Sequence, residues 1–113
     1  MARGHWKRAI TSFDEAIRLN PTDAGSYRDR GAAYGQRGDY RSSLDDLDRA
    51  LELLPEDPQA LFFRGLCFEA TRKRRQALDD FNRILALPSS EFTEKAQAEV
   101  RFLRYQREYS KIG

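Results

Sequence analysis

The strongest constraint on this chain is a period of 34 residues that runs through most of its length. Counting 34 positions forward from the central stretch returns a residue of the same kind each time: Gly31 returns as Gly65, Tyr34 as Phe68, Leu47 as Phe81, Ala50 as Ile84 and Leu53 as Leu87. Counting the same distance back takes Tyr40 to Trp6, Leu47 to Phe13 and Pro55 to Pro21. A repeat of this length, with two helices in each unit, is typical of a stacked helical array.

Apolar residues at helical spacing predict six helices and therefore an all-α fold. The expected ranges are 5–19, 24–36, 40–54, 58–71, 74–87 and 91–109. Gly38 is a natural residue to end a helix, and Asp57 followed by Pro58 is a preferred way to begin one. A small residue at Gly31, repeated at Gly65, predicts that two helix backbones approach closely at that point.

The repeating positions resemble the tetratricopeptide repeat (TPR) family. In the central unit they are Tyr27, Gly31, Tyr34, Gly38-Asp39-Tyr40, Ser43, Leu47, Ala50 and Pro55, and in the next unit Leu61, Gly65, Phe68, Ala77, Phe81 and Ile84. The resemblance implies a short right-handed α-solenoid of antiparallel helix pairs, with a capping helix at the C-terminus. It also implies one domain over 1–113: a half repeat at 4–23 with the second helix only, full repeats at 24–57 and 58–91, and the cap at 92–113.

The last helix is expected to close the stack, because a terminal helix with one apolar side keeps a repeat array soluble. Its predicted apolar stripe is Ala98, Phe102, Tyr105 and Tyr109.

Composition places the chain among soluble proteins. Charged residues are 34% of the 113 and the formal net charge is +2, which does not by itself attract nucleic acid or a membrane. The sequence has no apolar run long enough to span a bilayer, and its one cysteine, Cys67, excludes an internal disulfide. The expected location is the cytoplasm.

Catalysis has little support in the sequence, and we expect neither an enzyme nor a cofactor or metal. The single histidine, His5, has no cysteine or paired acid beside it. Cys67 aligns with Ala33 and is expected to be a small core residue. The carboxylates of Asp45-Asp46 and of Asp79-Asp80 recur with the repeat and are expected to be solvated.

The TPR resemblance implies a protein-interaction module, an adaptor or scaffold that holds a peptide or a helix in a concave groove. The groove positions that the family pattern assigns here are Arg28, Ala32, Gly35, Phe62, Leu66 and Glu69, with an extension over Ala96, Val100 and Leu103. An equally weighted alternative is that the capping helix simply covers Phe62 and Leu66.

One ligand mode of the family is disfavoured. TPR co-chaperones that bind the C-terminal tails of Hsp70 and Hsp90 resemble one another in a Lys/Asn/Asn/Lys/Arg clamp for the terminal carboxylate. The corresponding residues here are Arg28, Ala32, Phe63, Thr93 and Gln97. Only Arg28 could serve, so a carboxylate would find too few donors.

Two other functions stay open. The 5–19 helix is a second helix without its first, so it either re-pairs with the helix that follows it or recruits another chain, as in a homodimer, through Ile10, Phe13 and Ile17. Alternatively, the chain could be a fragment of a longer TPR array. The basic run Arg72, Lys73, Arg74 and Arg75 could be a nuclear-targeting or nucleic-acid patch, although a solvated turn is the favoured interpretation.

Overall fold

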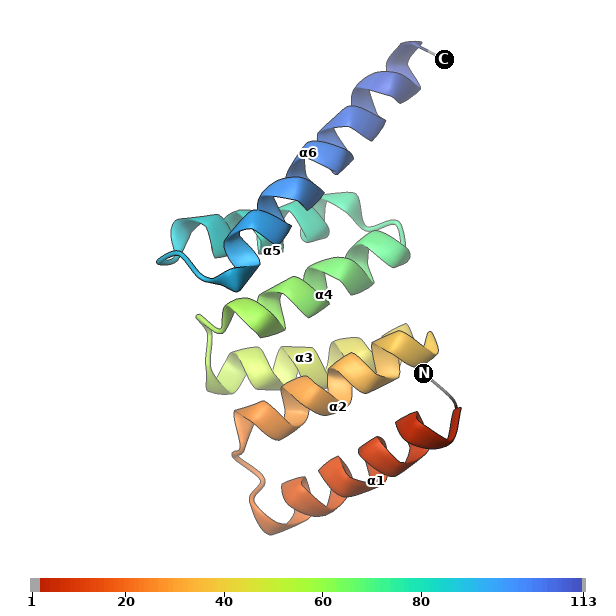
Figure 1. The fold of residues 1–113 in the computed structure, drawn as a ribbon, viewed down its shortest axis with the longest axis vertical. Coiled ribbons are helices and arrows are strands. Elements are labelled where there is room, and N and C mark those ends of the chain that lie inside the picture. Colours follow the sequence, from red (N-terminus) through yellow and green to blue (C-terminus); the bar gives the residue numbers. More distant parts are fainter. Residues whose placement is uncertain (1–2, 113) are drawn as a thin grey trace.

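The computed structural model describes the backbone of residues 3–112 and the side chains of residues 5–108. All regular structure in this part of the chain is helical (Figure 1). The six helices are α1 (Arg3–Leu19), α2 (Ala24–Arg37), α3 (Tyr40–Leu53), α4 (Pro58–Ala70), α5 (Arg74–Ala86) and α6 (Glu91–Ile112). The predicted all-α fold is confirmed, and each helix lies within a few residues of its predicted range.

Local signals in the sequence set the ends of the helices. Gly38 ends α2 with a φ of 89°, a left-handed conformation that glycine adopts without strain. The Asp57 carboxylate caps α4 by accepting hydrogen bonds from the backbone N–H groups of Gln59 at 3.0 Å and Ala60 at 3.4 Å. These signals keep the loops short and bring consecutive helices together as antiparallel neighbours.

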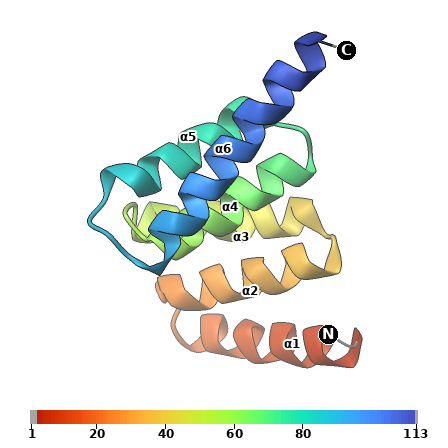
Figure 2. The same cartoon turned by 45° about the horizontal axis from the view of Figure 1, so that its top comes forward.

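The helices stack in one direction into an elongated body of 51 × 32 × 20 Å (Figures 1 and 2). The tightest pairs are α2 with α3 and α4 with α5, which are the two predicted full repeats. The first helix, α1, packs on α2 alone among the described helices. It therefore lies at one end of the stack beside the helix that follows it, without disturbing the pairing of that helix with α3.

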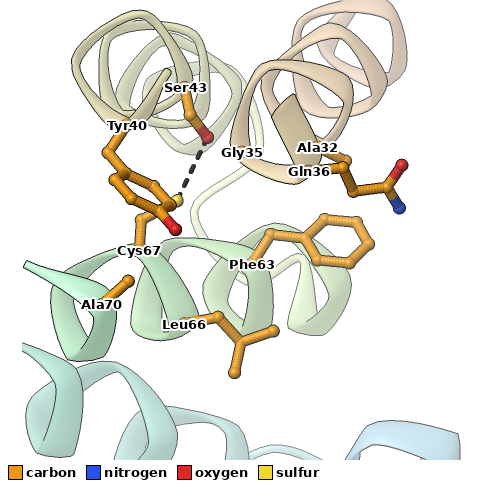
Figure 3. A pocket seen from close by; sticks show the side chains of 9 residues that line it. All are labelled: Ala32, Gly35, Gln36, Tyr40, Ser43, Phe63, Leu66, Cys67 and Ala70. Carbon is orange, nitrogen blue, oxygen red and sulfur yellow. Dashed lines mark hydrogen bonds between the residues drawn. The ribbon is translucent and has the colours of Figure 1, made fainter. Parts of the chain in front are cut away.

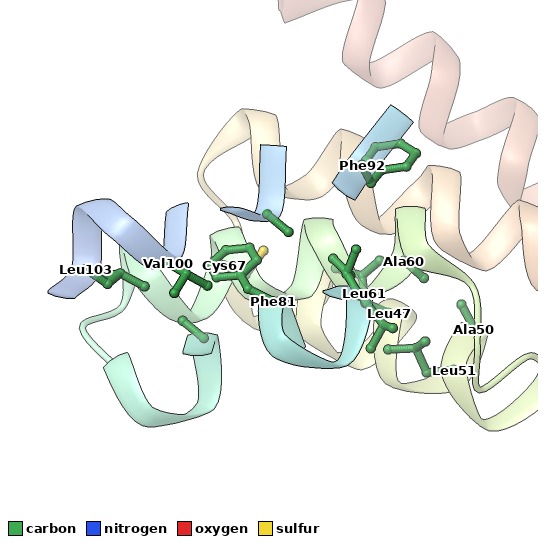
Figure 4. Packing of buried hydrophobic residues seen from close by; sticks show 13 residues of the cluster. Leu47, Ala50, Leu51, Ala60, Leu61, Cys67, Phe81, Phe92, Val100 and Leu103 are labelled. Carbon is green, nitrogen blue, oxygen red and sulfur yellow. The ribbon is translucent and has the colours of Figure 1, made fainter. Parts of the chain in front are cut away.

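The core runs along the stack, and two of its large side chains pack directly against a glycine of the neighbouring helix. The largest fully buried apolar side chains are Phe81, Leu47 and Leu61, which Figure 4 labels, and Ile84. A Cβ atom at Gly31 would lie 2.9 Å from Cγ of Leu47, and one at Gly65 would lie 2.5 Å from Cε1 of Phe81. The helix backbones therefore approach closely at both glycines, as their repetition predicts.

Two arginine–aspartate clusters, each built around one buried carboxylate, recur at the repeat distance. Arg30 donates two hydrogen bonds of 2.7 Å to Asp46 and one of 2.9 Å to Asp14. Arg64, 34 positions later, donates to Asp80 at 2.8 and 2.7 Å and to Asp48 at 3.0 Å. We call these the Arg–Asp clusters.

The sequence-based expectation that both aspartate pairs are solvated is therefore half wrong. Asp45 and Asp79 are exposed, but Asp46 and Asp80 are 6% and 3% exposed. Each is turned inward because an arginine of the preceding helix binds both of its oxygens, which compensates the cost of burying the charge. The paired Asp80 carboxylate raises the pKa of Arg64, against the opposing effect of burial.

The capping helix uses a different face from the one predicted. Phe92, Ala96, Val100 and Leu103 are buried against the stack, whereas Ala98 and Tyr105 are exposed and Phe102 is 48% exposed. The ring of Phe92 lies 5.6 Å from that of Phe62, and this contact orients α6. Ala96, Val100 and Leu103 thus belong to the core and not to a groove, and the side chain of Tyr109 lies outside the described part.

Within residues 3–112, no helix combines the length and the apolar character that crossing a lipid bilayer requires.

Candidate binding surface

A pocket of about 240 Å³ opens between α2, α3 and α4 (Figure 3). We call it the apolar pocket. Its lining residues are Ala32, Gly35, Gln36, Tyr40, Ser43, Phe63, Leu66, Cys67 and Ala70. Drug-sized ligands need pockets of about 300–1,000 Å³, so this one has the size for a single large side chain.

Small residues create the pocket where three helices meet. Ala32 and Gly35 of α2 leave room that larger side chains would fill, and Ala70 leaves the mouth open. A Cβ atom at Gly35 would lie 3.2 Å from Oγ of Ser43 and 3.5 Å from Sγ of Cys67. The pocket is thus a consequence of the small side chains at these positions.

The polar atoms at the base of the pocket are already hydrogen-bonded. Oγ of Ser43 donates to the carbonyl of Gly31 at 2.6 Å and lies 3.2 Å from Sγ of Cys67. Burial raises the pKa of the Cys67 thiol, and the hydrogen bond with Ser43 lowers it by less. Cys67 is 5% exposed, so it is the small core residue that the sequence predicts, and the pocket base is apolar in character.

The groove residues assigned from the family pattern divide into two groups. Ala32, Gly35 and Leu66 all line the apolar pocket. Arg28 and Phe62 instead make contacts within the fold. Arg28 ion-pairs with Asp57 at 3.0 Å and Asp29 at 3.1 Å, and Phe62 packs 5.8 Å from Phe81 and against Phe92 of the capping helix.

Glu69, the remaining groove residue, faces Glu99 of the capping helix. Oε2 of Glu69 is buried and has no hydrogen-bond donor, and the Glu99 carboxyl lies within its reach. Two carboxyl groups can hydrogen-bond only when one of them holds a proton. Burial and then this neighbour raise the pKa of Glu69 to about 7.

We therefore expect Glu69 to make stability depend on pH. The pKa of Glu69 in the folded chain exceeds the unfolded value of 4.5. Its protonated form therefore contributes fully to the stability of the fold below pH 4.5, and this contribution is lost as the pH rises through 7. Because the Glu69 side chain is only partly buried, Glu69→Gln should raise the free energy of unfolding by only about 1 kcal/mol at pH 8 and leave it unchanged at pH 4. Urea denaturation at both values measures this, with Glu56→Gln as an exposed control; a gain equal at both values would contradict it.

A second hollow, of about 250 Å³, adjoins the apolar pocket on the side of α1. We call it the α1 hollow. It is lined by Trp6, Ala9, Phe13, Asp29, Ala32, Ala33, Gln36, Gln59 and Phe63. Ala32, Gln36 and Phe63 belong to both hollows, so the two form one continuous surface over α2 and α4. Nε1 of Trp6 donates to Oε1 of Gln36 at 3.3 Å, which places the half-buried tryptophan at the rim of the hollow.

The other predicted interaction residues are only partly available. Ile10 is 8% exposed and lies in the core, whereas Phe13 and Ile17 are half-buried. Of the basic run, Arg72, Lys73 and Arg75 are exposed or nearly so, but Arg74 turns inward and donates to the backbone carbonyl of Leu103.

Sequence reasoning did not assign Gln36, Tyr40, Phe63 or Ala70 to the pocket. Tyr40 aligns with Trp6 in the repeat and Phe63 is one of several apolar residues of α4, so their pattern alone gives no sign of an open cavity between them. The sequence feature that could have indicated the pocket is the presence of small residues at positions 32, 35 and 70, which leave space where the three helices meet.

The described side chains include no group of three or more His, Cys, Asp or Glu residues placed to hold a metal ion. His5 is exposed.

Comparison with known proteins agrees with this geometry. The sequence profile of the tetratricopeptide repeat family matches residues 1–66. None of the curated protein sequences matches the chain.

Several solved structures share the fold. One is the first TPR of Spaghetti (RPAP3) bound to the HSP90 peptide SRMEEVD, with a TM-score of 0.84 and 23% identity over 92% of this chain and 81% of that one. The Arabidopsis OM64 TPR domain has a TM-score of 0.78 and 26% identity over 87% and 82%. The TPR2B domain of yeast Sti1 in complex with pHsp70 has a TM-score of 0.83 and 18% identity over 92% and 86%.

The matched profile covers more than half of the chain, and the helix pairs, the glycine contacts and the solved relatives agree with it. TPR domains are generally protein–protein interaction modules and typically non-catalytic. The chain belongs to the tetratricopeptide repeat family.

Proposed function

We propose that this domain binds a peptide or a helix of a partner protein across the surface of α2 and α4, and anchors it by one large apolar side chain in the apolar pocket. The observation that carries the proposal is the pocket itself, about 240 Å³ in volume and open at Ala70. Because its walls are helices of the stack, little conformational entropy is lost when a ligand enters.

Comparison of the pocket with the equivalent positions in the next repeat supports only one apolar anchoring site. Advancing the pocket by 34 positions replaces Gly35 with Glu69 and Tyr40 with Arg74. Arg74 is fixed to the carbonyl of Leu103 and Glu69 faces Glu99, so polar side chains occupy the equivalent place. A ligand therefore finds one apolar site, with charged groups beside it.

Recognition of a terminal carboxylate by the chaperone-tail clamp remains disfavoured. Ala32 and Phe63, which take the place of two clamp amides, are walls of the apolar pocket. The guanidinium of Arg28 is already held by two carboxylates. An anionic chain end would have to displace those ion pairs and would gain few donors in return.

Selection from a random peptide library displayed on phage tests the proposal. We expect the selected peptides to share one large apolar residue, and its replacement by alanine should weaken binding at least about tenfold.

Two matched variants locate the site. Ala70 and Ala86 are each the exposed last residue of a helix, α4 and α5, but only Ala70 borders the pocket. Ala70→Glu should weaken a selected peptide at least about tenfold in calorimetric titration, because it places a charge in the mouth of an apolar site. Ala86→Glu should leave the affinity unchanged; equal effects of the two variants would overturn the proposal.

A further inference from the structure

Gly35, in the last turn of α2, is a helical glycine that the packing of the helices does not require. Glycine favours a helix less than alanine does. At Gly31 and Gly65 an added Cβ atom would lie 2.9 and 2.5 Å from a side chain of the neighbouring helix, so glycine is needed there. At Gly35 the nearest atom would lie at 3.2 Å, and the equivalent position of the next repeat holds Glu69. The repeat therefore accommodates a side chain at this position, and the glycine has another explanation.

The atoms that a side chain at Gly35 would meet lie at the base of the apolar pocket. They are Oγ of Ser43 at 3.2 Å and Sγ of Cys67 at 3.5 Å. All three residues line the pocket, and Figure 3 shows the hydrogen bond that joins Ser43 to Cys67. A methyl group at position 35 would therefore occupy space at the base of the pocket, and its absence makes the pocket deeper.

The deepened pocket has the size and the walls for an aromatic ring. An apolar cavity of about 150 Å³ holds one benzene molecule, and this pocket measures about 240 Å³. Two of its walls are themselves aromatic, Tyr40 from α3 and Phe63 from α4, and Cys67 lies between their rings in Figure 3. Aromatic rings that meet in offset or edge-to-face arrangements gain more than their buried area alone provides. An aliphatic side chain would lack this gain.

We propose that the side chain that anchors the partner is aromatic, and that Gly35 is the residue that selects it. This inference rests on the proposed function. The ring enters past Ala70, lies against Tyr40 and Phe63, and fills the space that Gly35 leaves at the base. A leucine in the same place would leave part of that space empty and would lose the corresponding contacts.

Calorimetric titration of the intact chain with two versions of one library-selected peptide tests the proposal. The versions differ only at the anchor position, which is phenylalanine in one and leucine in the other. The phenylalanine version should bind about tenfold more tightly. Gly35→Ala should weaken the phenylalanine version about tenfold, because the added methyl group occupies the place of the ring. It should change the affinity for the leucine version by less than about threefold, which also shows that the variant is folded.

Two further variants separate the depth of the pocket from other effects of the substitution. Gly25→Ala is the matched control on the same helix, since an added Cβ atom there meets only ordinary contacts at 3.5 and 3.6 Å and Gly25 does not line the pocket. It should leave both affinities unchanged. Gly35→Ala combined with Cys67→Ala removes the sulfur atom that lies 3.5 Å from the added methyl group. This double variant should bind the phenylalanine version within about threefold of the original chain.

Three results would overturn the proposal. Equal affinities of the unaltered chain for the two versions would exclude an aromatic anchor. Equal weakening of both versions by Gly35→Ala would show that this residue does not select between them. A double variant as weak as Gly35→Ala would show that the loss comes from a shift of α2 and not from the depth of the pocket. Each of these results leaves the proposed function standing, since the variants at Ala70 and Ala86 test that function separately.

Discussion

Asp80→Ala should lower the free energy of unfolding by about 3 kcal/mol, because it removes one partner of a buried ion pair and leaves the other partner charged. Asp80 is 3% exposed and accepts two hydrogen bonds from Arg64. Without it, Arg64 keeps only the bond to Asp48, whose side chain is 55% exposed. Chemical denaturation at neutral pH measures the loss.

The neighbouring residue supplies the control. Asp79→Ala changes the same residue type one position earlier on α5, where the side chain is exposed, and should alter stability by no more than about 0.5 kcal/mol. If the two variants lose similar amounts of stability, the Arg–Asp cluster contributes no more than a surface charge does, and the description of Asp80 as a buried structural anion is wrong.

Gly65→Ala should cost about 2–3 kcal/mol even though alanine is the better helix former. A methyl group at this position would lie 2.5 Å from Cε1 and 2.8 Å from Cζ of Phe81. The Phe81 ring is fully buried and rests 5.8 Å from that of Phe62, so it has little room to move aside. The substitution must therefore separate α4 from α5.

Gly25→Ala is the matched comparison for this effect. Gly25 is also helical, but the nearest atoms to an added Cβ lie at 3.5 and 3.6 Å, which is ordinary contact. Alanine there should stabilise the chain by about 0.5–1 kcal/mol through helix propensity and the restricted unfolded state. A stabilising Gly65→Ala, measured in the same thermal denaturation series, would show that the helices do not meet as closely as described.

The role of the two glycines could be predicted from the sequence, whereas the burial of one aspartate in each pair could not. Gly31 and Gly65 recur at the repeat distance, and no residue with a Cβ fits where backbones approach, so their role follows from pattern alone. The two aspartate pairs recur equally well, but the pattern does not say which member of each pair turns inward. That depends on Arg30 and Arg64, which also recur but act from the preceding helix, 16 residues away.

The capping helix shows a second limit of pattern reasoning. It carries two apolar stripes, one through Phe102 and Tyr105 and the other through Phe92, Ala96, Val100 and Leu103. Helical spacing favours neither. The contact of Phe92 with Phe62 determines which stripe is buried. This contact depends on how α6 crosses α4, so it cannot be predicted from the sequence of either helix alone.

The apolar pocket could be predicted only in part, for a related reason. The family pattern pointed to Ala32, Gly35 and Leu66, which do line it, but a cavity is defined by the side chains that fail to fill it. The same pattern assigns Phe62 to the groove, but the capping helix packs against it through Phe92.

The most direct test of the binding account is to locate the ligand's apolar side chain by intermolecular NOEs in the complex with a library-selected peptide. The account predicts NOEs from that side chain to the methyl groups of Leu66 and the ring of Phe63, the two largest apolar walls of the pocket from α4. NOEs instead to Phe68 and Ala86, on the surface that α4 and α5 form away from the pocket, would contradict it.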